Sequence, residues 1–394
     1  GVEWTSTPAG DNLHRVVIFR DGAEKTGQTL PFSMFDSADP QDLWKYLAGY
    51  EDKTGGQAIA IPHNGNLSNG LMFSEKTFKG KKIDNEYAKT RMRWEPIIEM
   101  TQMKGDGETH PLLSPGDEFA DYEQWDLSNL AGTVAKTDDM LQYEYARSAL
   151  KLGLQISKET GVNPYKFGMS GASDTHTGLA TTREENYFGK YKSAEPGPDR
   201  HNTEVVPAQD PALKIFASQE LASGLMAVWA RENTRGEIFG AMKRKEVYAT
   251  TGTRIRVRVF AGWDFKADDV TRADFTAQGY RRGVPMGGEL RKAPIGKAPA
   301  FMVRALRDPD GANLDRVQII KGWLDEKGKT HERIYDVAVS DSRKIGSDGR
   351  AKDPVGSTVD IEKATYTNTI GDALMTAWWQ DPDFDVEEPA FYYV

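Results

Sequence analysis

The sequence predicts an α/β domain over residues 1–252, followed by a mostly antiparallel β domain over residues 253–394. Helix and strand signals alternate along the first part, which is typical of strands joined by helical crossovers. Beyond it, Ile255, Val257 and Val259 alternate with arginines at the period of two that a half-buried antiparallel strand shows. The length of 394 residues agrees with this division, since a domain takes roughly 150 residues.

The first elements of the α/β domain are expected before residue 62. Val16–Phe19 is a run of β-branched and aromatic residues, which favours a strand. Asp39-Pro40 predicts the start of a helix, because aspartate is a preferred N-cap and proline suits the first helical position. Gly55-Gly56 is expected to end that helix, and Ala58–Ile61 follows as a short buried strand that leads into Pro62-His63.

Later elements follow the same rhythm. A helix is expected over about 138–158 and a strand over 166–169. Thr234 and Glu237 have the spacing of a capping box, so a second helix is expected from there to about residue 248. Further strands of the β domain are expected at 301–306, 317–320, 334–339 and 357–361.

The composition excludes several classes of protein. No apolar run approaches the ~20 residues that a membrane-spanning helix needs. The formal net charge is −9, so no nucleic-acid partner is expected, because the phosphate backbone is bound by basic surfaces. The chain has no cysteine, which excludes disulfides, thiolate ligands and a cysteine nucleophile. This absence suits an oxidising compartment, such as the bacterial periplasm or the cell exterior, without establishing one.

Five residues have positions that suit metal ligands: Glu3, His14, His63, Asp174 and His176. Several of them directly follow predicted strands, and functional side chains gather at the C-terminal ends of strands in barrels of alternating strands and helices. Imidazole and carboxylate ligands suit Zn²⁺, Mn²⁺ or Fe²⁺ better than Ca²⁺. The alternative interpretation is that these residues are ordinary polar loop ends.

Other polar residues lie in the same segments. Lys104 is a candidate to present its ammonium group to a substrate anion, and His110 is a candidate to line the same cleft. The alternative for each is a solvated loop residue. The chain contains no glycine-rich phosphate loop and no Gly-x-Ser-x-Gly nucleophile elbow. The candidates to contact substrate or to support the ligands are Asn64, Asn66, Glu108 and Thr177.

Eight short motifs, spread over nearly the whole chain, are specific as a set although each is weak alone. They are Asn12-Leu13-His14-Arg15, Ile61–Ser68, Lys104-Gly105, Ser173–His176, Tyr248–Gly252, Met286-Gly287-Gly288, Val317–Trp323 and Ala390–Tyr393. This set resembles the DUF3604 family, which is related to the PHP (polymerase and histidinol phosphatase) metallohydrolases.

The resemblance implies a distorted (β/α)7 barrel, N-terminally incomplete in this chain, with two or three Zn, Mn or Fe ions at the C-terminal ends of its strands. Glu3 matches the bridging carboxylate, and His14 and His63 match later histidine ligands. Asp174 and His176 match the closing Asp-x-His pair. The β domain is then an appended module.

The chain departs from the family pattern in two places. The PHP pattern opens with His-x-His and a further Asp-His upstream of the bridging glutamate, and Glu3 leaves no room for either. We therefore expect a second segment, the N-terminal piece of the same protein, to bring these ligands as a partner and to fill a gap in the barrel. Gly107 stands where the family more often has serine. Tyr248–Gly252 matches the end of the last barrel helix.

These observations lead to one main hypothesis and two alternatives. The main hypothesis is the hydrolysis of small phosphoesters by a metal-activated water in a cage of two or three ions. The expected partner is a small-molecule ester, because the acidic balance disfavours long polyanions. The first alternative is that the same cage hydrolyses amides or sulfate esters. The second is a non-catalytic binding module that presents the β domain to a glycan or to the cell envelope.

Overall fold

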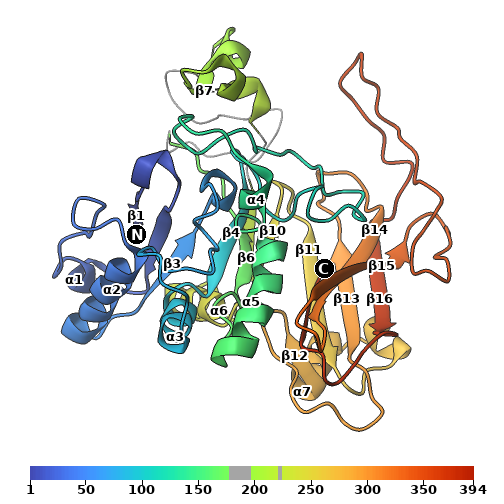
Figure 1. Cartoon of the computed structure of the whole chain (residues 1–394). Coiled ribbons are helices and arrows are strands. Elements are labelled where there is room, and N and C mark those ends of the chain that lie inside the picture. Colours follow the sequence, from blue (N-terminus) through green and yellow to red (C-terminus); the bar gives the residue numbers. More distant parts are fainter. Residues whose placement is uncertain (177–196, 221–223) are drawn as a thin grey trace. The chain divides into compact units, whose positions relative to one another are not determined.

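The computed structural model describes residues 1–176, 197–220 and 224–394, and it divides into two compact units, Gly1–Gly252 and Thr253–Val394 (Figure 1). The helices of the first unit are α1 (Ala23–Thr26), α2 (Pro40–Thr54), α3 (Asn85–Trp94), α4 (Asp138–Leu141), α5 (Ala146–Thr160) and α6 (Arg235–Lys243). Its strands are β1 (Val2–Trp4), β2 (Arg15–Phe19), β3 (Ala58–Pro62), β4 (Ile97–Gln102), β5 (Gly105–Asp106), β6 (Gly168–Gly171), β7 (Glu204–Val206), β8 (Ile215–Phe216), β9 (Leu225–Val228) and β10 (Val247–Thr250).

The second unit contains one α-helix and seven strands in the residues described. They are α7 (Phe275–Arg282), β11 (Arg256–Gly262), β12 (Gly283–Pro285), β13 (Ala300–Leu306), β14 (Arg316–Leu324), β15 (Thr330–Val339), β16 (Leu374–Gln380) and β17 (Ala390–Tyr393). Among the helices in the described ranges of both units, none is long and apolar enough to cross a membrane.

The expected helix after Asp39 is confirmed as α2. The Asp39 side chain accepts a hydrogen bond from the backbone N–H of Gln41, and Pro40 occupies the first turn. The helix ends at Gly55, whose φ of 62° lies in the left-handed region that glycine adopts without strain. Local capping chemistry therefore sets both ends of this helix, which is why the sequence alone predicted it.

The first unit is not a closed (β/α)7 barrel, so the barrel expected from the resemblance is wrong. Strands β1, β2 and β3 form an antiparallel sheet in that order, and β4 lies between β5 and β6. Of the strand pairs described, β4 with β6 is the one parallel pair. The reason is that a helix between two strands does not require them to run parallel: α2 lies in the connection from β2 to β3, which pair antiparallel.

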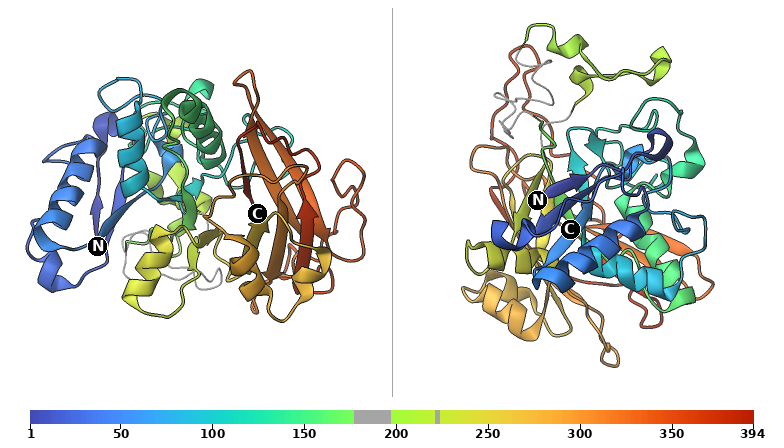
Figure 2. Two further views of the ribbon diagram at one scale, coloured as in Figure 1. Left: turned by 90° about the horizontal axis from the view of Figure 1, so that it is seen from below. Right: turned by 90° about the vertical axis from the view of Figure 1, so that its left-hand side faces the viewer.

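Helices cover both faces of these strands. One core cluster joins side chains of α2, α3 and α5 to Trp4, Val17 and Ala60, which share one face of the first sheet. A second cluster joins Ile59 and Ile61, on the opposite face, to residues of α6 and β10. Figure 2 shows α6 on the other side of the strands from α3 and α5. The first unit is therefore a layered α/β fold with an apolar core on each face of the first sheet.

Three local expectations are corrected. The helix expected over 138–158 is two helices, α4 and α5, separated by the turn at 142–145. The helix after Thr234 ends at Lys243, and Tyr248 belongs to strand β10, so Tyr248–Gly252 is not the end of a barrel helix. The segment 357–361 forms no strand and carries a single bridge, between Asp360 and Thr365.

All strand pairs described in the second unit are antiparallel. Strands β12, β11, β13 and β16 form one sheet, and β15, β14 and β17 form another. Val317 of β14 packs with Val303 of β13 and Met375 of β16, so the apolar faces of the two sheets meet. Phe275 of α7 packs on Phe260 of β11, so this strand is covered on both faces rather than on one.

A buried ion-pair network connects the elements of the first unit around Glu95. Arg15 Nε lies 3.0 Å from one carboxylate oxygen of Glu95, and Arg91 Nε lies 3.0 Å from the other. The indole N–H of Trp44 donates to the same carboxylate at 3.0 Å. Burial raises the pKa of Glu95, but the Arg15 and Arg91 guanidinium groups outweigh it and hold the pKa below its ordinary value. The network ties β2 and α2 to the junction of α3 and β4.

Substituting Glu95→Gln should destabilise the first unit strongly. The change leaves the guanidinium groups of Arg15 and Arg91 buried without a counter-charge, which typically costs about 3–5 kcal/mol of unfolding free energy. Urea unfolding followed by tryptophan fluorescence measures the loss. Lys45→Gln, which removes an exposed partner of Asp42, is the control and should leave the transition nearly unchanged. Equal midpoints for both variants would show that the network contributes no more than a surface ion pair.

Candidate functional site

The antiparallel register of the first sheet places two histidines and a glutamate on one face. In β2, Val16 pairs with Glu3 of β1 and with Ile61 of β3. The next positions on the same face are His14, just before β2, and His63, just after β3, because side chains alternate along a strand. Extending the pairing of Val16 with Ile61 by two residues along each strand places His14 opposite His63. Glu3, His14 and His63, called the triad below, therefore meet at one edge of the sheet.

The triad side chains are in contact. Oε1 of Glu3 lies 3.0 Å from Nδ1 of His14 and 3.2 Å from Nε2 of His63. The two imidazole rings have centroids 5.5 Å apart and meet at 77°. One ligand atom from each residue lies within 4.8 Å of the other two, so the three form a group that could hold a metal ion.

The electrostatics of the triad favour the protonation states that bind cations. Burial raises the pKa of Glu3, but hydrogen bonds from His14 and His63 outweigh it and hold the pKa well below its ordinary value. Burial lowers the pKa of His14, more than the nearby Glu3 carboxylate raises it. At neutral pH this pattern leaves a charged carboxylate beside a neutral imidazole, and these are the forms in which both groups ligate a metal.

The donor set fits a transition-metal ion such as zinc. Tetrahedral ligands at bonds of about 2.1 Å lie about 3.4 Å from one another. The Glu3 oxygen lies 3.0 and 3.2 Å from the two imidazole nitrogens, close to that spacing. Nε2 of His14 lies 2.9 Å from the Thr7 hydroxyl, which orients the ring from behind. Nδ1 of His63 is buried and has no hydrogen-bond partner among the residues described.

The structure places the other two predicted ligands just after strand β6, which pairs with β4. Asp174 forms an ion pair with the Lys104 ammonium group, and its backbone adopts a left-handed φ of 51°. His176 is exposed, and its Nδ1 lies 2.9 Å from the carbonyl oxygen of Asp174. Neither residue belongs to the group of three ligand atoms described above. Thr177 lies outside the described residues.

Amide side chains connect the segment after His63 to Lys104. Gln102 donates from Nε2 to Oδ1 of Asn64 at 2.7 Å and accepts at Oε1 from the backbone N–H of Lys104 at 3.0 Å. Asn66 donates to the carbonyl oxygen of Lys104 at 3.0 Å. Asn64 and Asn66, predicted to contact substrate or to support the ligands, thus hold the backbone around Lys104.

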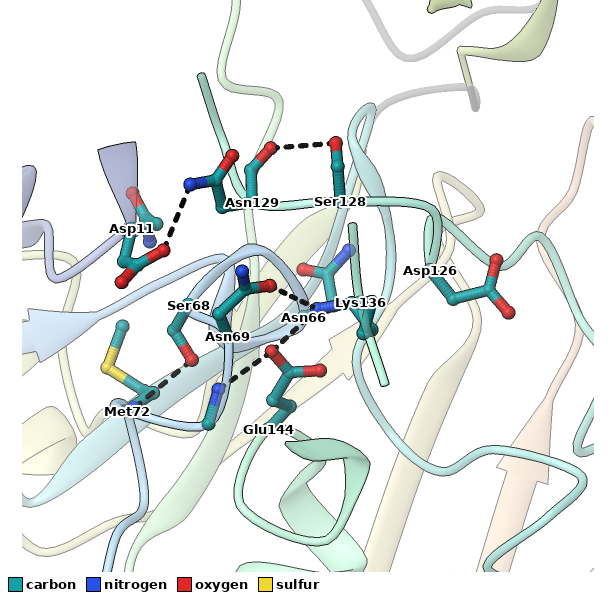
Figure 3. Close-up of polar contacts among 12 residues, drawn as sticks. Asp11, Asn66, Ser68, Asn69, Met72, Asp126, Ser128, Asn129, Lys136 and Glu144 are labelled. Atoms are coloured by element: carbon teal, nitrogen blue, oxygen red, sulfur yellow. Dashed lines mark hydrogen bonds and ion pairs between the residues drawn. The ribbon is translucent and has the colours of Figure 1, made fainter. Parts of the chain in front are cut away.

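A buried ion pair holds the rest of the segment that follows His63 (Figure 3). Nζ of Lys136 lies 2.7 Å from Oε1 of Glu144 and 3.2 Å from Oδ1 of Asn69. The backbone N–H of Gly70 donates to the same glutamate oxygen at 3.0 Å. Because both charged groups are shielded from water and paired, a change of loop conformation would leave a buried charge without its partner.

His110 and Glu108 are engaged in contacts of their own. Nδ1 of His110 accepts from the backbone N–H of Leu112 at 3.2 Å, and Nε2 lies 3.0 Å from an oxygen of Asp126. These contacts fix the ring with its proton on Nε2. Oε1 of Glu108 accepts from the Arg147 guanidinium at 2.8 Å. Both predicted residues thereby stabilise the segment between β5 and α4.

Two residues of the site were missed in the sequence, Glu99 and Gln102, both on β4. Glu99 interrupts the apolar run Ile97-Ile98-Glu99-Met100, and a charged residue inside a buried strand is a signal that could have found it. Gln102 carries no comparable signal, because its role depends on contacts with Asn64 and Lys104 that only the folded chain brings together.

A scan against protein-family models finds one match, described as a protein of unknown function (DUF3604), over residues 1–394. The chain belongs to the DUF3604 family. Comparisons of the chain with curated proteins and with solved structures find no match. The family match covers both units, so the triad and the β-rich second unit are parts of one family architecture.

Asp106, next to this site on β5, should make the stability of this DUF3604 protein fall as the pH rises. Burial and, after it, the charge of Glu108 raise the pKa of Asp106 from 3.8 to about 8. The unfolded chain therefore binds fewer protons than the folded chain between these values, and this carboxyl lowers the unfolding free energy by at most about 1.4 kcal/mol per pH unit. Chemical unfolding from pH 5 to pH 8 measures the effect.

Asp106→Asn keeps an acceptor for the backbone N–H of Glu108 and removes the titrating proton. The stability of this variant relative to the wild type should therefore rise steadily with pH. A difference that stays constant over the range would mean that Asp106 titrates normally in the folded chain.

Proposed function

We propose that this chain carries the cation-binding centre of a metal-dependent hydrolase that acts on small esters, in the first place phosphoesters. The observation that carries the proposal is the triad, in which a charged carboxylate and two imidazoles converge within 4.8 Å. The relation of DUF3604 to the PHP metallohydrolases, implied by the motifs described above, supports the reaction class. The ions that fit these ligands are zinc, manganese and iron.

Glu3, His14 and His63 would hold a cation, and Asp174 with His176 would complete the binding of further ions. When bound, such ions polarise an ester oxygen and make water a nucleophile near neutral pH. The chain itself contributes orientation: Thr7 fixes the His14 ring through its second nitrogen.

Lys104 is the residue proposed to bind the anionic part of the substrate. Its side chain is buried, it pairs with Asp174, and its positive charge is close enough to lower the pKa of His14. Gln102 and Asn66 hold its backbone in place. An ammonium group held at this depth interacts more strongly with an anionic ester oxygen than an exposed lysine would.

His63→Ala should abolish both cation binding and ester hydrolysis. The variant removes a buried ligand that faces Glu3, while β3 ends before this residue and keeps its pairing with β2. Metal content by mass spectrometry and hydrolysis of p-nitrophenyl phosphate, with and without a chelator, measure the two effects. His331→Ala, in the second unit, is the matched control and should change neither.

Other outcomes of this experiment separate the alternatives. Turnover of p-nitrophenyl sulfate or of an anilide, with no turnover of the phosphate, would support a hydrolase of sulfate esters or amides. Wild-type protein that holds no metal and shows no metal-dependent turnover would contradict the proposal and favour a binding module.

Lys104→Gln should lower kcat/KM for anionic esters at least tenfold and should change the value for neutral esters much less. The reason is that the variant removes a positive charge that only an anionic substrate needs. Steady-state kinetics on p-nitrophenyl phosphate and p-nitrophenyl acetate make the comparison. Equal losses on both substrates would assign Lys104 to the support of Asp174 instead.

A further inference from the structure

Glu99 lies on the same face of the strands as the triad. Along β4 its side chain alternates with those of its neighbours, so it points to the same side as Ile97. Ile97 packs with Ile59 and Ile61 of β3, and β4 lies beside β3. Since Ile61 and His63 share this face, Glu99 projects from the next strand into the same layer as the triad.

The carboxylate of Glu99 lies near charged groups of the site, although its oxygens are outside the group of three ligand atoms that the triad forms. Its Oε1 atom is shielded from solvent and has no hydrogen-bond partner in the described parts of the chain. Burial raises the pKa of Glu99 to about 7, and the charges that act on it include those of His63, Asp174 and Lys104. Gln102, which bonds to Asn64, also contacts this carboxylate. A buried acceptor without a partner at such a place calls for a ligand.

The balance of charge points to a cation as that ligand. In the residues described around His63, the carboxylates of Glu3, Glu99 and Asp174 are accompanied by the imidazole of His63 and the ammonium group of Lys104, while burial lowers the pKa of His14. Because Glu99 is desolvated, its ionised form needs further positive charge close by. A divalent cation supplies the missing positive charge.

We propose that Glu99 is a further ligand of the cation centre and binds a divalent ion through Oε1. This inference rests on the proposed function, because it assumes that the triad holds a metal. It adds an oxygen donor to the two imidazoles and the carboxylate of the triad. It also explains why a glutamate stands in the middle of an apolar strand.

Titration calorimetry with Mn²⁺ tests the proposal on the wild type and on Glu99→Gln. Glutamine has the same shape but no charge, so the variant should bind Mn²⁺ at least tenfold more weakly. The midpoint of its thermal unfolding without metal should stay unchanged or move to higher temperature. Glu246→Gln is the matched control, since Glu246 is a buried glutamate of the same unit that pairs with Arg244, and its Mn²⁺ affinity should equal that of the wild type.

Glu99→Asp serves as a second variant, because it keeps the charge and shortens its reach, and it should show intermediate affinity. Equal Mn²⁺ affinity in the wild type and in either folded Glu99 variant would overturn the inference and leave the proposed function intact. A wild type that binds no Mn²⁺, Zn²⁺ or Fe²⁺ would overturn both.

Discussion

The register of β2 between β1 and β3 is the constraint on which the candidate site depends. It puts Glu3, His14 and His63 on one face and Trp4, Val17 and Ala60 on the other, where they enter the core. A slip of one residue would send the imidazoles into that apolar core and the core residues to the site. The ion pair of Arg15 with Glu95 opposes such a slip, since it forms only when Arg15 faces away from the triad. The stability of the fold and the geometry of the site therefore share one cause.

Electrostatics give the site its character as a cation site. Burial raises the pKa of Glu99 and lowers that of His14, while hydrogen bonds from His14 and His63 hold the pKa of Glu3 well below its ordinary value. Buried amides and the ion pair of Lys136 with Glu144 hold the segment that follows His63 and the backbone of Lys104. Such preorganisation lowers the entropic cost of binding an ion or a substrate.

Local signals predicted the secondary structure well where a side chain acts on its own backbone. Asp39 caps the N-terminus of α2 and Gly55 caps its C-terminus. The Thr234 side chain caps α6 by accepting a hydrogen bond from the backbone N–H of Glu237. The barrel expectation failed because alternation of helices and strands says which elements exist but not how the strands pair. The β2–β3 pair is antiparallel in spite of the helix between them, and pairing between residues 39 to 47 positions apart decides that.

The sequence by itself determined most of the candidate residues of the site, the acidic balance of the chain and the membership of the family, because each of these is a property of residue identities and short motifs. It predicted Glu3, His14, His63, Asp174 and His176 together as ligands of one metal cage, and the structure groups the first three. Only the tertiary structure decided that these three meet, that Lys104 pairs with Asp174, and that Glu99 faces the same layer. The physical reason is that strand register and strand direction arise from contacts between distant segments, and no local pattern of residues encodes them.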